Sequence, residues 1–209
     1  LYELDVVKSS CYFYTDDSRE EENRYVNLFE NLPLEEVFCP LDQSGIFLKM
    51  QSIWSAMYNR SFLVENHIRF NETPGASFQD VSFAFQVYAC AKRLMLLPDA
   101  FYHYRISNLN SSVRAPDKVF CVCDELDKIE AFITKYGNNK ELLRVIASRL
   151  GYRVLLEQYN NLADPYQYTL FLKIMEYFKE YKDSGFIYET IWEKDEVEKI
   201  EQILENPEK

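Results

Sequence analysis

The sequence predicts a mixed α/β fold up to about residue 115, followed by a helical bundle. Two observations carry this prediction. β-branched and aromatic residues concentrate in short runs before residue 106, and apolar residues recur every three or four positions after residue 117. The length of 209 residues and the hydrophobic content of 47% predict one large domain, or one domain with a helical extension. Helix is expected to predominate overall.

The first part is expected to open with a strand over residues 4–14. Val6, Val7 and the run Cys11–Tyr14 supply the β-branched and aromatic side chains that strands favour. Residues 15–24, TDDSREEENR, predict a charged loop. Further on, four residues share one helical face, which predicts a short helix packed into the core: Ile53, Trp54, Met57 and Tyr58.

A loop, a helix and two strands are predicted next. Residues 70–77, FNETPGAS, contain the Asn, Pro and Gly typical of loops. Residues 94–97 and 101–105 predict two short strands joined around Pro98. Between the loop and the strands, four apolar residues have the i, i+3, i+4, i+7 spacing of a buried helix face: Val81, Ala84, Phe85 and Tyr88.

Helical periodicity continues from about residue 117 to the end of the sequence. Breaks at Gly137, Asp164–Pro165 and Ser184–Gly185 separate successive helices. Their apolar stripes predict packing surfaces rather than a cofactor site. The expected faces are Val119, Val122, Leu126, Ile129 and Ile133; Leu143, Ile146, Leu150 and Val154; Tyr168, Phe171, Leu172, Met175 and Phe178; and Val197, Ile200, Ile203 and Leu204.

The charge distribution excludes nucleic acid as an expected partner. The net charge is −11, which opposes binding to a polyanion and simple electrostatic docking on anionic lipid. Residues 49–118 differ from the rest of the chain, because 8 basic and 5 acidic side chains give this segment a local charge of +3. Such a centre tolerates an anionic ligand without requiring one.

The cysteines and histidines predict no metal site. The five cysteines lack metal-ligand spacing, and Cys121 and Cys123 point about 200° apart on a helix. They are expected to be reduced thiols in a cytoplasmic protein. His67 and His103 are the chain's two histidines, and neither has a motif-like neighbour. No run approaches the ~18–20 apolar residues of a membrane span, so no transmembrane segment is expected.

Five short motifs occur in order between residues 50 and 115. They are Trp54-x3-Tyr58-Asn59-Arg60-x-Phe62-Leu63, Ile68-x-Phe70, the Pro/Gly loop, Phe78-Gln79-Asp80-Val81-x-Phe83, and Tyr102-His103-Tyr104-Arg105 followed by Ser111-Ser112. In this order and spacing the chain resembles family 2 glycosyltransferases of the bacterial polysaccharide and lipopolysaccharide type. The second half of those enzymes commonly has W-x-K-L-Y-R-R-x-F-L, I-x-F, E-D-V-x-F and Y-x-Y-R followed by Ser. Residues 4–7 also resemble the strand that follows the nucleotide-binding half in that family.

The resemblance implies the acceptor-side part of a GT-A-like fold in residues 1–115 and a C-terminal helical region in residues 116–209. In the family, a Gly-rich strand–helix start and a D-x-D motif hold a nucleotide sugar and a divalent metal, Mg or Mn. This sequence has no counterpart of either motif. Residue 1 is Leu within a strand-like run, so we expect the donor-binding half upstream. Alone, the chain is expected to bind no cofactor, metal or nucleotide sugar, and to be inactive.

Asp80 is the candidate catalytic residue. By the resemblance, the carboxylate at the start of the helix after the Pro/Gly loop is the general base of an inverting enzyme, which deprotonates the acceptor hydroxyl. Gln79 replaces the acid that usually precedes this base. From the residues alone, Asp80 is equally a first-turn acid, which the helix dipole stabilises by about 0.3–1 kcal/mol.

The remaining candidates are acceptor-binding residues: Trp54, Tyr58, Gln79, Tyr104 and Arg105. Aromatic faces pack against sugar C–H groups, although Trp54 and Tyr58 are also suited to the core because they share a face with Ile53. Strand alternation places Tyr102 and Tyr104 on one face and Arg105 on the other. Arg60 is expected either to contact a phosphate or to pair with a surface acid.

Two functions follow as hypotheses. In the first, the chain is the C-terminal portion of a cytoplasmic glycosyltransferase, peripheral at the inner face of the cell membrane, which acts on a glycan or lipid-linked sugar acceptor. In the second, it is a non-catalytic helical binding module for a protein or glycan partner. An upstream strand–Gly–helix start and a D-x-D motif favour the first hypothesis, and their absence opposes it.

Overall fold

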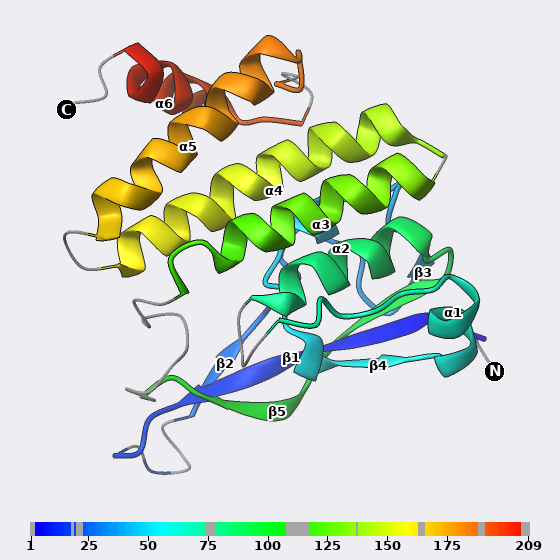
Figure 1. Ribbon diagram of the computed structural model, residues 1–209. Helices are drawn as coiled ribbons and strands as arrows, with labels where there is room; N and C mark the ends of the chain where they lie inside the picture. Colours follow the sequence, from blue (N-terminus) through cyan, green and yellow to red (C-terminus); the bar gives the residue numbers. More distant parts are fainter. Residues whose placement is uncertain are drawn as a thin grey trace. The chain divides into compact units, whose positions relative to one another are not determined.

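A mixed β-sheet with flanking helices forms the first part of the chain, and helices form the rest (Figure 1). The chain divides into unit 1, Leu1–Glu72 with Gln79–Ser111, and unit 2, Thr73–Phe78 with Ser112–Lys209. The chain contains both strands and helices, which confirms the prediction of a mixed α/β fold, and most residues in these regular elements are helical. The computed structural model describes residues 3–17, 19, 23–73, 78–107, 118–136, 138–162, 166–187 and 191–205.

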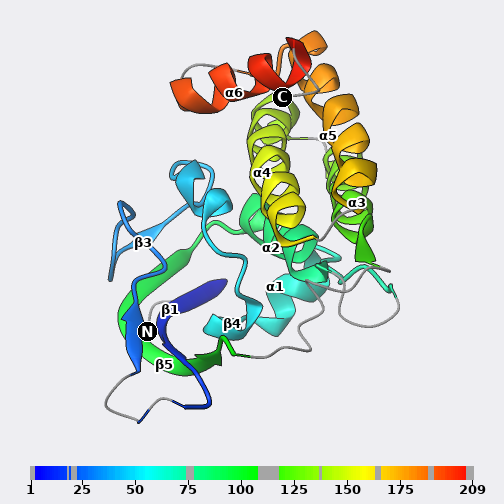
Figure 2. The same cartoon turned by 90° about the vertical axis from the view of Figure 1, so that its left-hand side faces the viewer.

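The sheet of unit 1 is built around two long parallel strands, β1 (Val6–Tyr14) and β5 (Leu94–Arg105). One edge of β1 pairs with two short antiparallel strands, β2 (Arg24–Val26) at its C-terminal half and β4 (Ala56–Tyr58) at its N-terminal half. β3 (Val37–Phe38) pairs antiparallel with β5. The strand order is β2-β1-β5-β3, and the sheet curls, as Figure 2 shows.

The strand predicted at residues 4–14 is confirmed as β1, but the two strands predicted around Pro98 are one strand, β5. The ladder with β1 is irregular at this point, because Ser9 pairs with Leu97 and Ser10 pairs with Ala100. The irregularity lets Pro98, which has no N–H, remain within the strand. Proline therefore does not end the strand here.

The helix predicted for residues 53–58 is absent from the structure. A three-residue 3₁₀ turn, η3 (Ile53–Ser55), leads directly into β4. The prediction was wrong because β1 offers an open edge, and Ala56–Tyr58 satisfy their backbone groups by pairing with Lys8–Val6. Met57 consequently lies on the surface, with 73% of its area exposed.

Two helices of unit 1 follow β4. The first, α1 (Arg60–Glu65), begins at Asn59, whose side chain accepts hydrogen bonds from two backbone N–H groups of the first turn. The second, α2 (Gln79–Cys90), confirms the predicted buried face and buries every residue from Val81 to Cys90. Its rings contact Phe47 of a second 3₁₀ turn, η2 (Ser44–Leu48).

Unit 2 contains α3 (Cys121–Tyr136), α4 (Lys140–Asn161), α5 (Tyr166–Asp183) and α6 (Lys194–Glu205), each packed on the next (Figure 1). The predicted α3 and α4 faces are buried. The predicted α5 face is confirmed at Phe178 but was wrong at Tyr168 and Leu172, which are 69% and 47% exposed. α5 carries apolar side chains on several sides, and its neighbours select a different set: Leu170, Ile174, Phe178 and Tyr181.

Several sequence features fall outside the described residues. These are Pro74, Gly75, Gly137, Asp164–Pro165 and Ser111-Ser112. No helix in the described part of the chain is long and apolar enough to cross a bilayer. All five cysteines are free thiols.

Candidate functional site

Asp80 lies in the first turn of α2 and is half-buried. The residue directly before this helix, Phe78, has φ of 64°, a left-handed conformation that bulky residues rarely adopt. Backbone strain of this kind costs on the order of 1–3 kcal/mol and concentrates at functional sites. The start of α2 is therefore a place where the chain accepts a local cost to hold a specific geometry.

A buried lysine on β1, Lys8, lies close to this helix start. It is 1% exposed. Its Nζ donates a hydrogen bond to the Ser52 carbonyl oxygen at 2.7 Å and lies 6.0 Å from the ring centroid of Tyr88 on α2. A buried ammonium requires polar or charged neighbours, because its transfer out of water is costly. Ser52 supplies the hydrogen bond, and Asp80 supplies the opposite charge.

The electrostatics link Lys8, Asp80 and Tyr58. Burial lowers the pKa of Lys8 to about 7, while the charge of Asp80 acts in the opposite direction and favours the ammonium. The attraction is mutual, so the ammonium also favours an ionised Asp80. Burial, followed by the charge of Asp80, raises the pKa of Tyr58, which keeps its hydroxyl protonated. We call Lys8, Tyr58 and Asp80 the Asp80 cluster.

Trp54 and two tyrosines of β5 form an aromatic stack. The ring of Trp54 lies 4.5 Å from the ring of Tyr102 and 4.8 Å from the ring of Tyr104, with interplanar angles of 28° and 12°. The prediction that the two tyrosines share a face of the strand is confirmed. The stack and the Asp80 cluster are joined by the η3–β4 segment, in which the Tyr58 hydroxyl donates to the Ile53 carbonyl at 3.4 Å.

Arg105 is held at the far end of β5 by an acid of the charged loop. Its Nη2 lies 2.6 Å from Asp16 Oδ2, which also accepts a hydrogen bond from Ser107 Oγ at 2.7 Å. The ring of His103 lies 5.0 Å from the ring of Tyr12 at an angle of 32°, and its Nδ1 lies 3.2 Å from Asn23 Nδ2. Within the described ranges, no group of three or more His, Cys, Asp or Glu side chains is placed to hold a metal ion.

The structure thus brings some predicted residues together and separates others. Tyr58 joins Asp80, Tyr104 joins Trp54, and Gln79 precedes Asp80 as the first residue of α2. Arg105 belongs to a separate ion pair. Sequence reasoning missed Lys8, although one signal was available: it is the single charged residue in the β1 sequence VVKSSCYFY.

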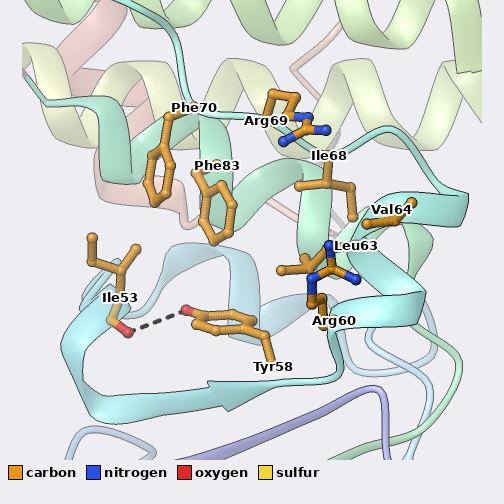
Figure 3. A pocket seen from close by; sticks show the side chains of 9 residues that line it. All are labelled: Ile53, Tyr58, Arg60, Leu63, Val64, Ile68, Arg69, Phe70 and Phe83. Atoms are coloured by element: carbon orange, nitrogen blue, oxygen red, sulfur yellow. Dashed lines mark hydrogen bonds between the residues drawn. The ribbon is translucent and has the colours of Figure 1, made fainter.

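A cavity of about 410 Å³ adjoins the Asp80 cluster within unit 1 (Figure 3). Tyr58 and Phe83 line it, and their rings meet edge to face at 5.5 Å. Phe83 is three residues beyond Asp80 on α2, a spacing that puts both side chains on one helix face. The cavity and the candidate base are therefore neighbours.

Comparison with known proteins adds no assignment. No family model matches the sequence, and no curated protein is significantly similar to it. The proposed function is therefore based on the geometry of the site and on the motif resemblance.

Proposed function

We propose that this chain is the acceptor-side portion of an inverting, GT-A-type family 2 glycosyltransferase. The observation that carries the proposal is the Asp80 cluster: a half-buried carboxylate at a helix start, next to the buried cation Lys8. A general base must be ionised and must be held in place before its substrate arrives. The charge of Lys8 favours the ionised form of Asp80, and the first turn of α2 carries the carboxylate. A first-turn acid that served only the helix dipole would not require a buried ammonium beside it.

In the proposed reaction, Asp80 accepts the proton of the acceptor hydroxyl as that oxygen attacks the anomeric carbon of the donor sugar. A new C–O bond forms on one face of the sugar. The bond to the nucleoside diphosphate breaks on the other face, and its electron pair leaves with the phosphate oxygen. Lys8 is a positioning residue here, since it favours the ionised form of Asp80 and does not contact the reacting atoms.

The acceptor is a glycan or a lipid-linked sugar in this proposal. The stack of Trp54, Tyr102 and Tyr104 provides flat apolar surface of the kind that packs against sugar C–H groups. Tyr58 adds a protonated hydroxyl next to Asp80. Gln79 directly precedes Asp80 as the first residue of α2. Arg105 is not part of this acceptor surface, because it pairs with Asp16.

The nucleotide sugar and its divalent metal belong to another part of the proposed enzyme. The described residues do not fit a D-x-D site, because Asp16 of the one Asp-Asp pair is engaged by Arg105 and Ser107. The proposed location is cytoplasmic, at the inner face of the cell membrane, where lipid-linked acceptors are accessible.

The test is acceptor-dependent release of nucleoside diphosphate by the protein encoded by the whole parent reading frame. A panel of UDP-, GDP- and TDP-sugars with Mg²⁺ or Mn²⁺ is offered with and without a glycan and lipid extract of the source cells. The proposal expects release from at least one donor, increased by the extract, together with a sugar-modified product. Absence of turnover and of donor binding across the panel would instead favour a binding module.

A further inference from the structure

The cavity beside Asp80 has a surface divided into apolar walls and a cationic rim. The walls are formed by apolar side chains: Ile53, Leu63, Ile68 and the stacked rings of Phe70 and Phe83, whose centroids lie 4.0 Å apart. The rim carries two arginines that are exposed to solvent, Arg60 and Arg69. In the view of Figure 3, Ile68 lies between them. The volume of about 410 Å³ falls at the lower end of the range of about 300–1,000 Å³ typical of small-molecule sites.

Among the described residues, neither rim arginine has the acidic surface partner that the sequence allowed for. No carboxylate in the described part of the chain pairs with either guanidinium, whereas Arg105, Arg144 and Arg149 each have one. This contrast occurs in a chain with 34 acidic residues and a net charge of −11. Neither guanidinium is paired with an acid within the described ranges, so each can form charge-assisted hydrogen bonds with an anionic ligand at the cavity.

We propose that this cavity is a subsite for an anionic group, a carboxylate or a phosphate, carried by the sugar acceptor. The inference rests on the proposed function and narrows its substrate class to acidic or phosphorylated acceptors. A guanidinium matches a carboxylate or phosphate with two parallel hydrogen bonds, which orients the ligand as well as attracting it. The apolar walls then contact the C–H faces of the attached sugar.

The position of the cavity gives the anionic group a role in catalysis. Phe83 and Tyr58 connect its wall to Asp80, so an acceptor anchored by its charge at the rim extends its neutral end toward the candidate base. Anchoring at a distance from the reacting hydroxyl fixes its orientation, which is how remote binding energy accelerates a reaction. A neutral acceptor would lack this anchor.

The test is an NMR titration of the ¹⁵N-labelled chain with five probes: glucuronic acid, glucose 1-phosphate, glucose, inorganic phosphate and UDP. We expect both anionic sugars to shift the amide signals around residues 60–70 and Phe83, more strongly than glucose or phosphate alone. The variant Arg60→Gln/Arg69→Gln should bind the anionic sugars roughly tenfold or more weakly, since each charged hydrogen bond contributes on that scale. Added salt should weaken binding as well.

The control is Arg153→Gln, which removes one charge from an exposed arginine of α4 that does not line the cavity. It should leave the titrations unchanged. Equal affinity for glucose and glucuronic acid, phosphate binding as tightly as the sugar anions, UDP binding tightest, or unaltered binding in the double variant would each overturn the subsite. Glucuronic acid and glucose 1-phosphate separate a carboxylate from a phosphate as the preferred group.

The outcomes for the subsite and for the enzyme are separable. Arginine-dependent binding of a sugar anion together with no transfer by the parent protein would retain the subsite and remove the glycosyltransferase proposal. Transfer to neutral acceptors only, unaffected by the arginine substitutions, would retain the glycosyltransferase proposal and remove the anionic subsite.

Discussion

Replacement of Lys8 by methionine removes a buried ammonium and leaves a side chain of similar length. Burial lowers the pKa of Lys8 from 10.5 to about 7 in the folded protein. The unfolded chain keeps this proton up to about pH 10.5. Between these values the unfolded state binds about one more proton than the folded state, so the stability of the native protein rises with pH. The slope from this residue is about 1.4 kcal/mol per pH unit.

The variant lacks this titration and should therefore show a different pH profile. Between pH 7 and pH 9, the wild type is expected to gain roughly 2 kcal/mol of unfolding free energy relative to Lys8→Met. Below pH 7 the buried charge is present in the wild type, and the variant should be the more stable protein. The Ser52 carbonyl keeps a donor in the variant, because Ser55 Oγ lies 3.0 Å from it.

Urea unfolding at pH 6, 7, 8 and 9 in reducing buffer measures the effect. A Trp192→Phe background leaves Trp54, in the same unit as Lys8, as the single indole reporter. Both proteins contain the same cysteines and tyrosines, so the difference between their profiles isolates Lys8. Parallel profiles over this range would refute the lowered pKa, and with it the electrostatic account of the Asp80 cluster.

Two further predictions concern unit 2. Gly151→Ala should destabilise the protein by about 1–3 kcal/mol in urea unfolding, despite the higher helix propensity of alanine, because the new Cβ would clash with the Tyr181 hydroxyl oxygen. Addition of Tyr181→Phe should restore most of the loss, and full stability of the single variant would contradict the clash. Arg149→Gln should cost roughly 2–4 kcal/mol and speed amide exchange in α6, because Arg149 Nε lies 2.6 Å from Glu196 in a pair whose side chains are 12% exposed. The exposed Lys179→Gln control should change stability by less than about 0.5 kcal/mol, and equal effects of the two changes would contradict this account.

Sequence reasoning succeeded where one local pattern determines the structure. The β-branched and aromatic residues of β1 and the i, i+3, i+4, i+7 spacing in α2 each favour one kind of element, and both elements formed where expected. It failed where a distant partner decides. Residues 56–58 form a strand because β1 provides an open edge, and β5 continues through Pro98 because the ladder is irregular there. Neither the open edge of β1 nor the irregular ladder between β1 and β5 can be predicted from the residues next to these segments in the sequence.

The candidate site shows the same division. The position of Asp80 at a helix start was predictable from its neighbours in sequence. The influence of its charge on Lys8 was not, since 72 positions separate the two residues and a lysine in a strand normally lies on the surface. The separation of Arg105 from the cluster was also not predictable. It depends on Asp16 of the charged loop, which pairs with Arg105 at the end of β5. Interactions between charged residues that are far apart in the sequence produce no periodic pattern from which they could be predicted.

The most direct test of the central claim is the transfer rate of the parent protein with Asp80→Asn. Under saturating acceptor, the account predicts a fall of about 10²–10⁴-fold, the typical contribution of a general base, with unchanged donor affinity. Asp124→Asn is the matched control, because it removes a first-turn acid from α3 and should leave the rate intact. A rate in Asp80→Asn within threefold of wild type, or an equal loss in both variants, would contradict the assignment of Asp80 as the base.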